Sequence, residues 1–329
     1  MIDMLDTYNR NINYLRISVT DRCNLRCRYC MPEEGISKLD HGEILSLEDI
    51  VRLVKVAVGV GIRKIRLTGG EPLVRKDIAR LIGFISEVPE IDDIAMTTNG
   101  VLFADMAEQL KAAGLDRVNF SMDTMVSEKF RYISRRDHLA DVRKAIFKAL
   151  ELGLEPVKIN TVVIRGFNDD ELLDFADLAF DFPLHIRFIE FMPIGDLLFW
   201  KKDRMITSEQ IKEKIEQRYE LTPTKLVKGS GPARYFKLAG GRGTIGFITP
   251  MSHKFCSECN RLRMTADGKL RGCLYDKREI DLKKALQSKP SDEDLKQLFI
   301  EAILLKPYEH HMDAGWGKDN PRKMSQIGG

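Results

Sequence analysis

Six cysteines in two groups of three are the residues of this chain with the clearest capacity for chemistry. The first group has the spacing C-x-x-x-C-x-x-C and consists of Cys23, Cys27 and Cys30. The second has a C-x-x-C pair and a third cysteine after thirteen more residues, and it consists of Cys256, Cys259 and Cys273. Structural zinc sites and cubane iron-sulfur clusters are usually held by four protein ligands. Each triad is one ligand short, so each predicts a metal site with a position open to a small molecule.

Two other uses of six cysteines are possible. Three disulfides would be typical of a small secreted protein, but the start MIDMLDTYNRNINY lacks the apolar segment of a signal peptide, and 329 residues can bury a core without crosslinks. A pair of zinc sites, completed by His253 or another residue, is the second alternative. We expect redox metal clusters in a reducing cytoplasm.

The overall composition is that of an ordinary globular protein, with 43% hydrophobic and 31% charged residues. No apolar run approaches the roughly 20 residues that span a bilayer. The formal net charge of +3 is too small to predict nucleic-acid or membrane binding. Any anionic ligand must therefore be bound by a local cluster of cations.

From residue 14 to about 192, short apolar strands alternate with amphipathic helices, which predicts parallel strands joined by crossover helices. We expect the strands at 14–19, 64–68, 93–98, 117–121, 157–163 and 185–191. We expect the helices at 46–61, 77–87, 103–113, 138–151 and 169–181, the first of them capped by Ser46 and Asp49. Six such units fit either a partial barrel or a doubly wound sheet. In both folds, ligands bind at the carboxyl ends of the strands.

Five motifs follow or end these strands, so we expect them to meet at one mouth. The first cysteine triad follows the first strand, and the turn Gly69-Gly70-Glu71-Pro72 follows the second. The others are Thr97-Thr98-Asn99-Gly100, Ser121-Met122-Asp123 and Phe191-Met192-Pro193. Glycines at such a turn allow close approach to a ligand, and exposed backbone groups there could bind the two ends of an amino acid.

Four cations interrupt the apolar alternation in the middle of predicted strands, namely Arg16, Arg66, Lys158 and Arg187. Buried cations are costly unless they are paired. They indicate either internal salt bridges, for instance through Glu190, or a pocket that receives an anion. We favour the anion pocket, because salt bridges would explain one or two such residues better than four.

Together, the C-x-x-x-C-x-x-C loop and the Gly-Gly-Glu-Pro turn resemble the radical S-adenosylmethionine superfamily. The resemblance implies that the first triad holds a 4Fe-4S cluster whose fourth iron is chelated by the amino and carboxylate groups of S-adenosylmethionine. An electron from that cluster would cleave the sulfonium and yield a 5'-deoxyadenosyl radical. The protein would contribute positioning, electron delivery and exclusion of water.

The C-terminal third narrows the resemblance, because GTIGFITPMSHKFCSECNRLRMTADGKLRGCL and the closing Gly328-Gly329 are similar to the GTP 3',8-cyclase family of molybdenum cofactor biosynthesis. The similarity implies a lyase-type enzyme that converts GTP to (8S)-3',8-cyclo-7,8-dihydroguanosine 5'-triphosphate, the first step of molybdopterin biosynthesis. The radical would remove hydrogen from the ribose C3', and that carbon would attack C8 of guanine. A second 4Fe-4S cluster, at Cys256, Cys259 and Cys273, would offer its free iron to the guanine.

The same resemblance assigns roles residue by residue. Positions that contact S-adenosylmethionine are matched by Tyr29, Gly70, Ser121 and Met192. Positions that bind GTP are matched by Arg16, Arg66, Thr97, Lys158, Arg261, Leu262 and Arg263. Arg187 belongs with these cations, and we expect Arg16 and Arg263 to take part in catalysis. Guanidinium groups suit phosphate oxygens because they form paired hydrogen bonds.

We therefore expect an α/β protein with an incomplete (β/α)6 TIM-type barrel as its radical core, residues 6–225. A smaller C-terminal domain, residues 226–329, would carry the second cluster, the GTP site and a Gly-Gly tail. The expected partners are GTP, an electron donor and the cyclic pyranopterin monophosphate synthase that receives the product, with no nucleic acid or membrane. Monomer and homodimer both stay open.

Two alternatives remain at this point. One is a radical peptide-modifying enzyme whose second cluster conducts electrons, although such relatives generally bring more auxiliary cysteines. The other is a non-enzymatic iron-sulfur electron carrier or a zinc-organised binding module.

The residues from Lys306 onward are rich in glycine, proline and charge, so composition alone predicts a frayed tail. The resemblance implies instead that the terminal Gly-Gly threads into the active site. We leave His310 and His311 without a role.

Overall fold

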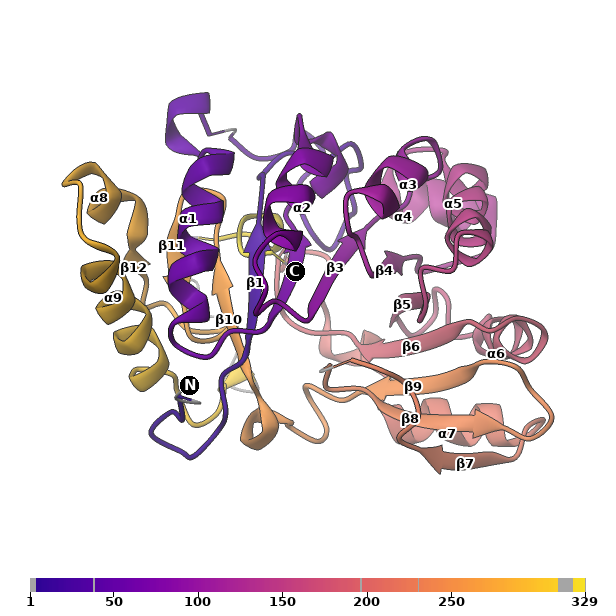
Figure 1. Ribbon diagram of the computed structural model, residues 1–329. Coiled ribbons are helices and arrows are strands. Elements are labelled where there is room, and N and C mark those ends of the chain that lie inside the picture. Colours follow the sequence, from indigo (N-terminus) through magenta and orange to yellow (C-terminus); the bar gives the residue numbers. More distant parts are fainter. Residues whose placement is uncertain (1–3, 38, 196, 230, 313–321, 329) are drawn as a thin grey trace.

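A single sheet of twelve strands runs through the whole computed structural model (Figure 1). The structure describes residues 4–37, 39–195, 197–229, 231–312 and 322–328. The strand order is β12-β11-β10-β1-β2-β3-β4-β5-β6-β9-β8-β7. The six central strands therefore follow one another in chain order, and the strands of the C-terminal third extend both edges.

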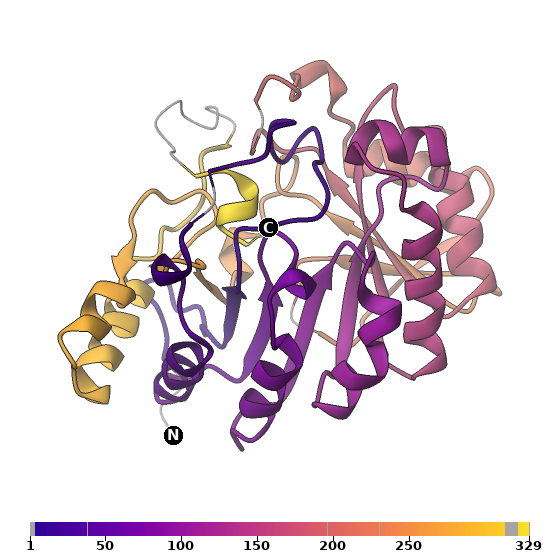
Figure 2. The same cartoon turned by 90° about the horizontal axis from the view of Figure 1, so that it is seen from above.

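The central strands are all parallel, because each is joined to the next by a crossover through at least one helix. Their bounds are β1 Tyr14–Ser18, β2 Lys64–Thr68, β3 Asp93–Thr98, β4 Arg117–Ser121, β5 Lys158–Val163 and β6 His185–Glu190. All six strands predicted from the sequence are confirmed to within one residue. Of the two arrangements left open, the structure has the incomplete (β/α)6 barrel, an open arc with its helices on the outside (Figure 2).

The crossover helices are α1 Leu47–Val58, α2 Ile78–Ser86, α3 Phe103–Ala112, α4 Ser127–Ser134, α5 Leu139–Glu151 and α6 Leu172–Asp181. The predicted capping box at the start of α1 is present, since Ser46 accepts from the Asp49 amide and Asp49 reaches back to the Ser46 amide. Helix α4 was not predicted. It is short, it begins after Val126 with no capping side chain, and only Phe130 and Ile133 give it an apolar face.

The remaining elements belong to the C-terminal half. They are α7 Ser208–Glu216, β7 Leu221–Thr224, β8 Arg234–Leu238, β9 Thr244–Ile248, β10 Arg261–Met264, β11 Lys269–Arg271, β12 Ile280–Asp281, α8 Leu282–Gln287 and α9 Asp292–Leu304. Strand β9 pairs in parallel with β6, and β10 pairs in parallel with β1. Residue 225, at which we placed the division between two domains, falls between the paired strands β7 and β8. The sheet is therefore continuous across that division.

The hydrophobic core fills the space between the outer face of the sheet and the helices, and it is one continuous cluster across both halves. Helix α9 packs beside α1, where Arg52 forms an ion pair with Asp292 at 2.9 Å (Figure 1). In the described part of the chain, no helix has the length and apolar character required to cross a bilayer. Because the core lies outside the arc, the inner face is left for polar side chains.

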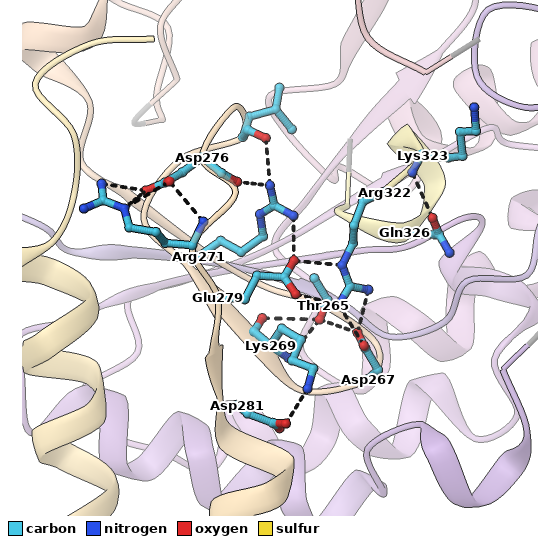
Figure 3. Close-up of polar contacts among 12 residues, drawn as sticks. Thr265, Asp267, Lys269, Arg271, Asp276, Glu279, Asp281, Arg322, Lys323 and Gln326 are labelled. Atoms are coloured by element: carbon cyan, nitrogen blue, oxygen red, sulfur yellow. Dashed lines mark hydrogen bonds and ion pairs between the residues drawn. The ribbon is translucent and has the colours of Figure 1, made fainter. Parts of the chain in front are cut away.

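The C-terminal segment, residues 322–328, is held inside this arc by an ionic network (Figure 3). Arg322 donates to both oxygens of Asp267 at 3.0 and 2.8 Å and to both oxygens of Glu279 at 2.8 Å. Glu279 also accepts a hydrogen bond from Arg271 at 2.7 Å. These acceptors lie on and beside the β10–β11 hairpin, and they raise the pKa of Arg322 further above its ordinary value although burial opposes the shift. Beyond the anchor, Ser325 and Ile327 are buried.

We predict that Arg322→Ala releases this segment while the rest of the fold stays intact. If Arg322 contributes about 1.4 kcal/mol to the free energy that holds the segment in place, its loss would raise the fraction of molecules with a detached segment roughly tenfold. Cleavage by a broad-specificity protease, mapped by mass spectrometry, should therefore become about tenfold faster within residues 322–328. The control is Arg278→Ala, since Arg278 is exposed and, among the residues that the structure describes, forms an ion pair with Asp276 and with no residue of the C-terminal segment. Equal cleavage rates in the two variants would contradict the assigned anchor.

Candidate functional site

One cavity lies inside the arc and contains both cysteine triads in its lining. All six cysteines have free thiols, so the disulfide alternative is wrong for this structure. The cavity also contains residues from each of the five motifs expected at the strand ends, among them Gly70, Thr97, Ser121 and Met192. Residues as far apart in the chain as Tyr14 and Ser325 therefore meet at one site.

Part of the polar lining comes from pairs of residues two apart on the same strand. The pairs are Tyr14 and Arg16, Arg66 and Thr68, Asn119 and Ser121, and Arg261 and Arg263. Side chains alternate between the two faces of a strand, so the residues between them point outward into the core. Tyr14, Asn119 and Asn160 were not singled out from the sequence. The i, i+2 recurrence of polar residues in otherwise apolar strands is the signal that would have identified them.

The cations of this inner face lie close together. Arg66 donates to Thr97 Oγ1 at 3.2 Å and to the Tyr14 hydroxyl, and Arg187 is buried beside them. Among the described residues, no Asp or Glu forms an ion pair with Arg66, Lys158 or Arg187, whereas neighbouring Arg117 is paired with Asp93. Burial and the neighbouring Arg187 lower the pKa of Lys158 to about 6. Burial and Arg261 lower that of Arg263 to about 10.

Glu190 does not neutralise these cations, contrary to the salt-bridge alternative. Its carboxylate is fully buried and accepts from the backbone amides of Ser208 at 3.0 Å and of Met251 and Ser252 at 2.9 Å. It therefore joins β6 to α7 and to the loop after β9. The cations with which Glu190 does not pair form a cluster of like charges that can receive an anion.

Two of the residues assigned to GTP lie outside the cavity lining. Leu262 is fully buried in the hydrophobic core, because it points to the opposite face of β10 from Arg261 and Arg263. Lys158 is also buried, and its Nζ donates to the carbonyl of Lys228. The five others, Arg16, Arg66, Thr97, Arg261 and Arg263, line the cavity.

The first triad is positioned by backbone contacts. The amides of Arg26 and Arg28 donate to the carbonyls of Ser134 and Ile133, at the end of α4, at 3.0 and 2.9 Å. The amide of Glu71 donates to the carbonyl of Arg22 at 2.7 Å. The missed helix α4 and the Gly-Gly-Glu-Pro turn thus hold the cysteine loop from two sides.

Gly70 is required at this turn by the cysteine loop itself. A Cβ there would lie 2.3 Å from the Arg22 carbonyl oxygen, and the Gly70 amide already donates to Thr20 at 2.8 Å. The sequence predicts that exposed backbone groups of the turn could bind a ligand. The amides of Gly70 and Glu71 bind the cysteine loop instead, so these two amides position the cysteines.

Two buried carboxyl groups lie beside the first triad. Glu71 accepts from Thr98 Oγ1 and from the Asn99 amide, each at 2.7 Å, and burial raises its pKa to about 7. Asp123 accepts from the Tyr29 hydroxyl at 2.7 Å and from the Val162 amide at 2.9 Å, and burial raises its pKa to about 6. This end of the cavity therefore carries acidic groups, whereas the middle carries cations.

The thiols of the first triad form a close group. Burial raises the pKa of Cys23 to about 11 and that of Cys30 to about 12, and the neighbouring thiols contribute to the shift at Cys27 and Cys30. Mutual repulsion of this kind is removed when thiolates bind a metal. In the described part of the chain, no three His, Cys, Asp or Glu side chains converge on one metal ion. A cubane needs no such convergence, because each cysteine binds a different iron.

The second triad differs in its surroundings. Burial opposes ionisation of Cys259, but Arg261 and Lys306 outweigh it and lower the pKa of that thiol to about 6. His253, the residue proposed to complete a zinc site, is exposed, and its Nε2 lies 2.9 Å from Oε1 of Glu209. The zinc alternative therefore loses its candidate fourth ligand. A thiolate held by cations suits an anionic iron-sulfur cluster.

The segment from Lys306 to Met312 and the C-terminal segment contact both triads, so the described residues after Lys306 are not frayed. The backbone amide of His310 contacts the sulfur of Cys256, and that of Ser325 contacts the sulfur of Cys30. Arg263 donates to the carbonyl of Gly328, which has a φ of 68°. A Cβ on Gly328 would lie 2.8 Å from Thr68 Cγ2. Gly329 lies outside the described residues.

The two histidines that were left without a role occupy different places. His310 is buried in the cavity lining and accepts from the Met312 amide at 3.3 Å, whereas His311 is exposed. His310 therefore contributes to the structure of the segment.

The chain matches two protein-family models. Residues 17–179 match the model described as the Radical SAM superfamily, and residues 184–312 match Molybdenum Cofactor Synthesis C. Among solved structures, the chain is similar to Streptococcus suis SuiB bound to S-adenosylmethionine, with a TM-score of 0.59 and 15% identity over 88% of this chain and 69% of that one. That likeness shows the fold alone.

Two relatives match over nearly the whole chain. The GTP 3',8-cyclase of Syntrophomonas wolfei is 65% identical, and that of Desulforamulus reducens is 56% identical, each over 99% of this chain and 100% of the relative. With two cysteine triads facing one cation-lined cavity, the chain belongs to the GTP 3',8-cyclase family of the radical S-adenosylmethionine superfamily.

Proposed function

We propose that this chain catalyses the radical cyclisation of GTP to (8S)-3',8-cyclo-7,8-dihydroguanosine 5'-triphosphate, the lyase reaction that begins molybdenum cofactor biosynthesis. It uses S-adenosylmethionine and two 4Fe-4S clusters, in keeping with its family. The observation that carries the proposal is the single cavity in which both cysteine triads and a cluster of buried cations meet. The peptide-modifying and non-enzymatic alternatives do not account for that cluster.

When bound, the first cluster supplies the electron that cleaves S-adenosylmethionine, and the second supplies an iron with a free position for the substrate. Cys23, Cys27 and Cys30 would hold the first, and Cys256, Cys259 and Cys273 the second. Tyr29, Gly70, Ser121 and Met192 would bind S-adenosylmethionine. Their location at the acidic end of the cavity supports this role, because the carboxyl groups of Glu71 and Asp123 would favour the positively charged sulfonium and ammonium groups of S-adenosylmethionine.

GTP would bind at the cationic part of the cavity. Arg16, Arg66, Thr97, Lys158, Arg261, Leu262 and Arg263 would form this site, with Arg187 beside them. The guanidinium groups neutralise phosphate oxygens and fix their orientation through paired hydrogen bonds. Arg16 and Arg263 would also act in catalysis. They would hold the ribose of GTP toward the end of the cavity that carries the first cysteine triad. Leu262 would contribute only through its backbone, since its side chain lies in the core.

The proposal also covers organisation and partners. Residues 6–225 would serve as the radical core and residues 226–329 as the auxiliary-cluster and GTP-binding part, within one continuous sheet. An electron donor would reduce the first cluster, and the cyclic pyranopterin monophosphate synthase would consume the product. The enzyme would work in the cytoplasm as a monomer or homodimer, with no nucleic-acid or membrane partner.

The decisive experiment is an anaerobic assay of the reconstituted protein. Two 4Fe-4S clusters require about eight irons per chain. With a reductant, S-adenosylmethionine and GTP, we expect 5'-deoxyadenosine and the cyclised nucleotide in equal amounts, measured by liquid chromatography and mass spectrometry. Zinc as the only metal would reject the cluster assignment. Cleavage of S-adenosylmethionine with GTP unchanged would reject GTP as the substrate.

We predict that Arg66→Ala weakens GTP binding roughly 10- to 100-fold, because a hydrogen bond to a charged group contributes about 1.5–3 kcal/mol. Both clusters should stay intact, since Arg66 contacts Tyr14 and Thr97 and no cysteine. Arg80→Ala is the control, because Arg80 is exposed on α2. Titration calorimetry under anaerobic conditions measures the affinity. An unchanged affinity in Arg66→Ala and also in Arg263→Ala would remove the proposed triphosphate site.

We predict that GTP binding takes up a proton at Lys158. The pKa of Lys158 is about 6 in the free protein, because of burial and Arg187. A triphosphate nearby would raise it, so the affinity should be highest below pH 6 and should fall as the pH rises toward the pKa of the complex. Calorimetry at pH 7.5 in buffers of different ionisation enthalpy measures the uptake.

The matched variant for this measurement is Lys158→Met. Ionisation of GTP itself contributes equally in both proteins, so the difference in proton uptake isolates Lys158. We expect that difference to approach one proton. The same uptake in both proteins would show that Lys158 does not respond to the nucleotide.

A further inference from the structure

The chain after α9 places a buried ammonium group against the second cysteine triad. Lys306 is only 3% exposed, and its Nζ lies 3.4 Å from the Sγ of Cys259. The same nitrogen donates to the carbonyl of Arg261 at 3.0 Å and to the carbonyl of Gly272. Gly272 precedes Cys273, so one side chain joins the chain segments that carry two of the three cysteines.

The partners of Lys306 determine what its charge does. An ammonium group has three donors and no acceptor, and its three donors here are directed at one sulfur and two carbonyls. A buried cation is costly unless an anion compensates it. Of the three groups that Lys306 contacts, the sulfur of Cys259 is the one that would be a ligand of the second cluster. The positive charge of Lys306 would therefore lie against an anionic cluster.

A second cation holds the same segment from its other side. Arg10 donates to the carbonyl of Cys256 at 2.8 Å, to that of Pro307 at 2.8 Å and to that of Tyr308 at 3.0 Å, and it forms an ion pair with Asp6 at 2.6 Å. Arg10 thus attaches the segment to the cysteine loop without touching a sulfur. Because this attachment does not involve Lys306, the segment should keep its position when Lys306 is replaced.

We propose that Lys306 is a positioning residue of the second cluster. It holds the segments that carry Cys259 and Cys273 at a fixed separation, and its positive charge beside the Cys259 sulfur raises the reduction potential of the cluster. Hydrogen bonds and positive charge at a cluster's sulfur ligands stabilise the reduced state. They also withdraw electron density from the irons, so the open iron becomes a better acceptor for a ligand nitrogen or oxygen. This inference rests on the proposed function, because it requires the second cluster.

The test is a redox titration of full-length chain in which Cys23, Cys27 and Cys30 are replaced by Ala, so that only the second cluster gives a signal. We compare Lys306→Met, Lys306→Gln and the unchanged lysine by electron paramagnetic resonance. At a fixed potential, Lys306→Met should lower the ratio of reduced to oxidised cluster at least tenfold, which is about 59 mV for one electron. Lys306→Gln keeps a hydrogen-bond donor but loses the charge. Its ratio of reduced to oxidised cluster should lie between those of Lys306→Met and the unchanged protein.

The matched control is Lys283→Met in the same background. Lys283 also joins segments by donating to two carbonyls, those of Gly42 and Ile44, but it contacts no cysteine. We expect its titration curve to equal that of the unchanged protein. A general effect of removing a lysine that links segments would appear in both variants.

Each outcome decides the proposal. A titration curve for Lys306→Met that matches the Lys283→Met curve would overturn it. If Lys306→Met binds no iron, the titration of Lys306→Gln tests the proposal in its place. A reduction potential of Lys306→Gln equal to that of the unchanged protein would overturn the electrostatic role. Absence of a four-iron cluster in the unchanged protein would instead reject the proposed function, so the two failures are distinguishable.

Discussion

Repulsion among buried cations on the inner face of the sheet is the constraint on which the arrangement of this protein depends. Burial and the neighbouring Arg187, Arg117 and Arg66 lower the pKa of Lys158 to about 6, and the nearby carboxylate of Asp93 is bound to Arg117. Such a cluster costs stability in the absence of an anion. It persists because a continuous core on the outer face of the same strands stabilises the sheet. The free energy that would be recovered when a triphosphate neutralises the cluster is then available to bind the substrate.

The opposite charges at the two ends of the cavity follow from the strand order. The first triad and the carboxyl groups of Glu71 and Asp123 come from loops at the ends of β1, β2 and β4. The second triad flanks β10, which enters the sheet beside β1 and brings Arg261 and Arg263 with it. Cys256 and Cys259 precede β10, which is parallel to β1, and Cys273 follows the antiparallel strand β11. The second triad therefore lies near the amino ends of β10 and β1, across the cavity from the first triad, which follows the carboxyl end of β1. Two ligands of opposite charge can then occupy one cavity, each drawn to its own end.

The fold was largely predictable from the sequence, because buried parallel strands and capped amphipathic helices have local signals. The capping box of Ser46 and Asp49 is one such case. Helix α4 was missed because its stability comes from packing and from carbonyls that hold the cysteine loop, neither of which is local. The joining of β9 to β6 and β10 to β1 was also missed, since nothing in a short strand identifies its partner. In the site, cysteines and strand cations were recognisable by type, whereas Tyr14 and Asn160 required the inward face to be known.

The chain beyond Lys306 shows how composition can mislead. Glycine, proline and charge usually indicate a segment with too little apolar surface to pack. Here the charges themselves provide the attachment, since Lys306 is directed at Cys259 and Arg322 at Asp267 and Glu279. Charged residues can anchor a segment only where their partners are already positioned by a rigid scaffold. The order of these segments therefore depends on the sheet, which positions Cys259, Asp267 and Glu279 as their partners.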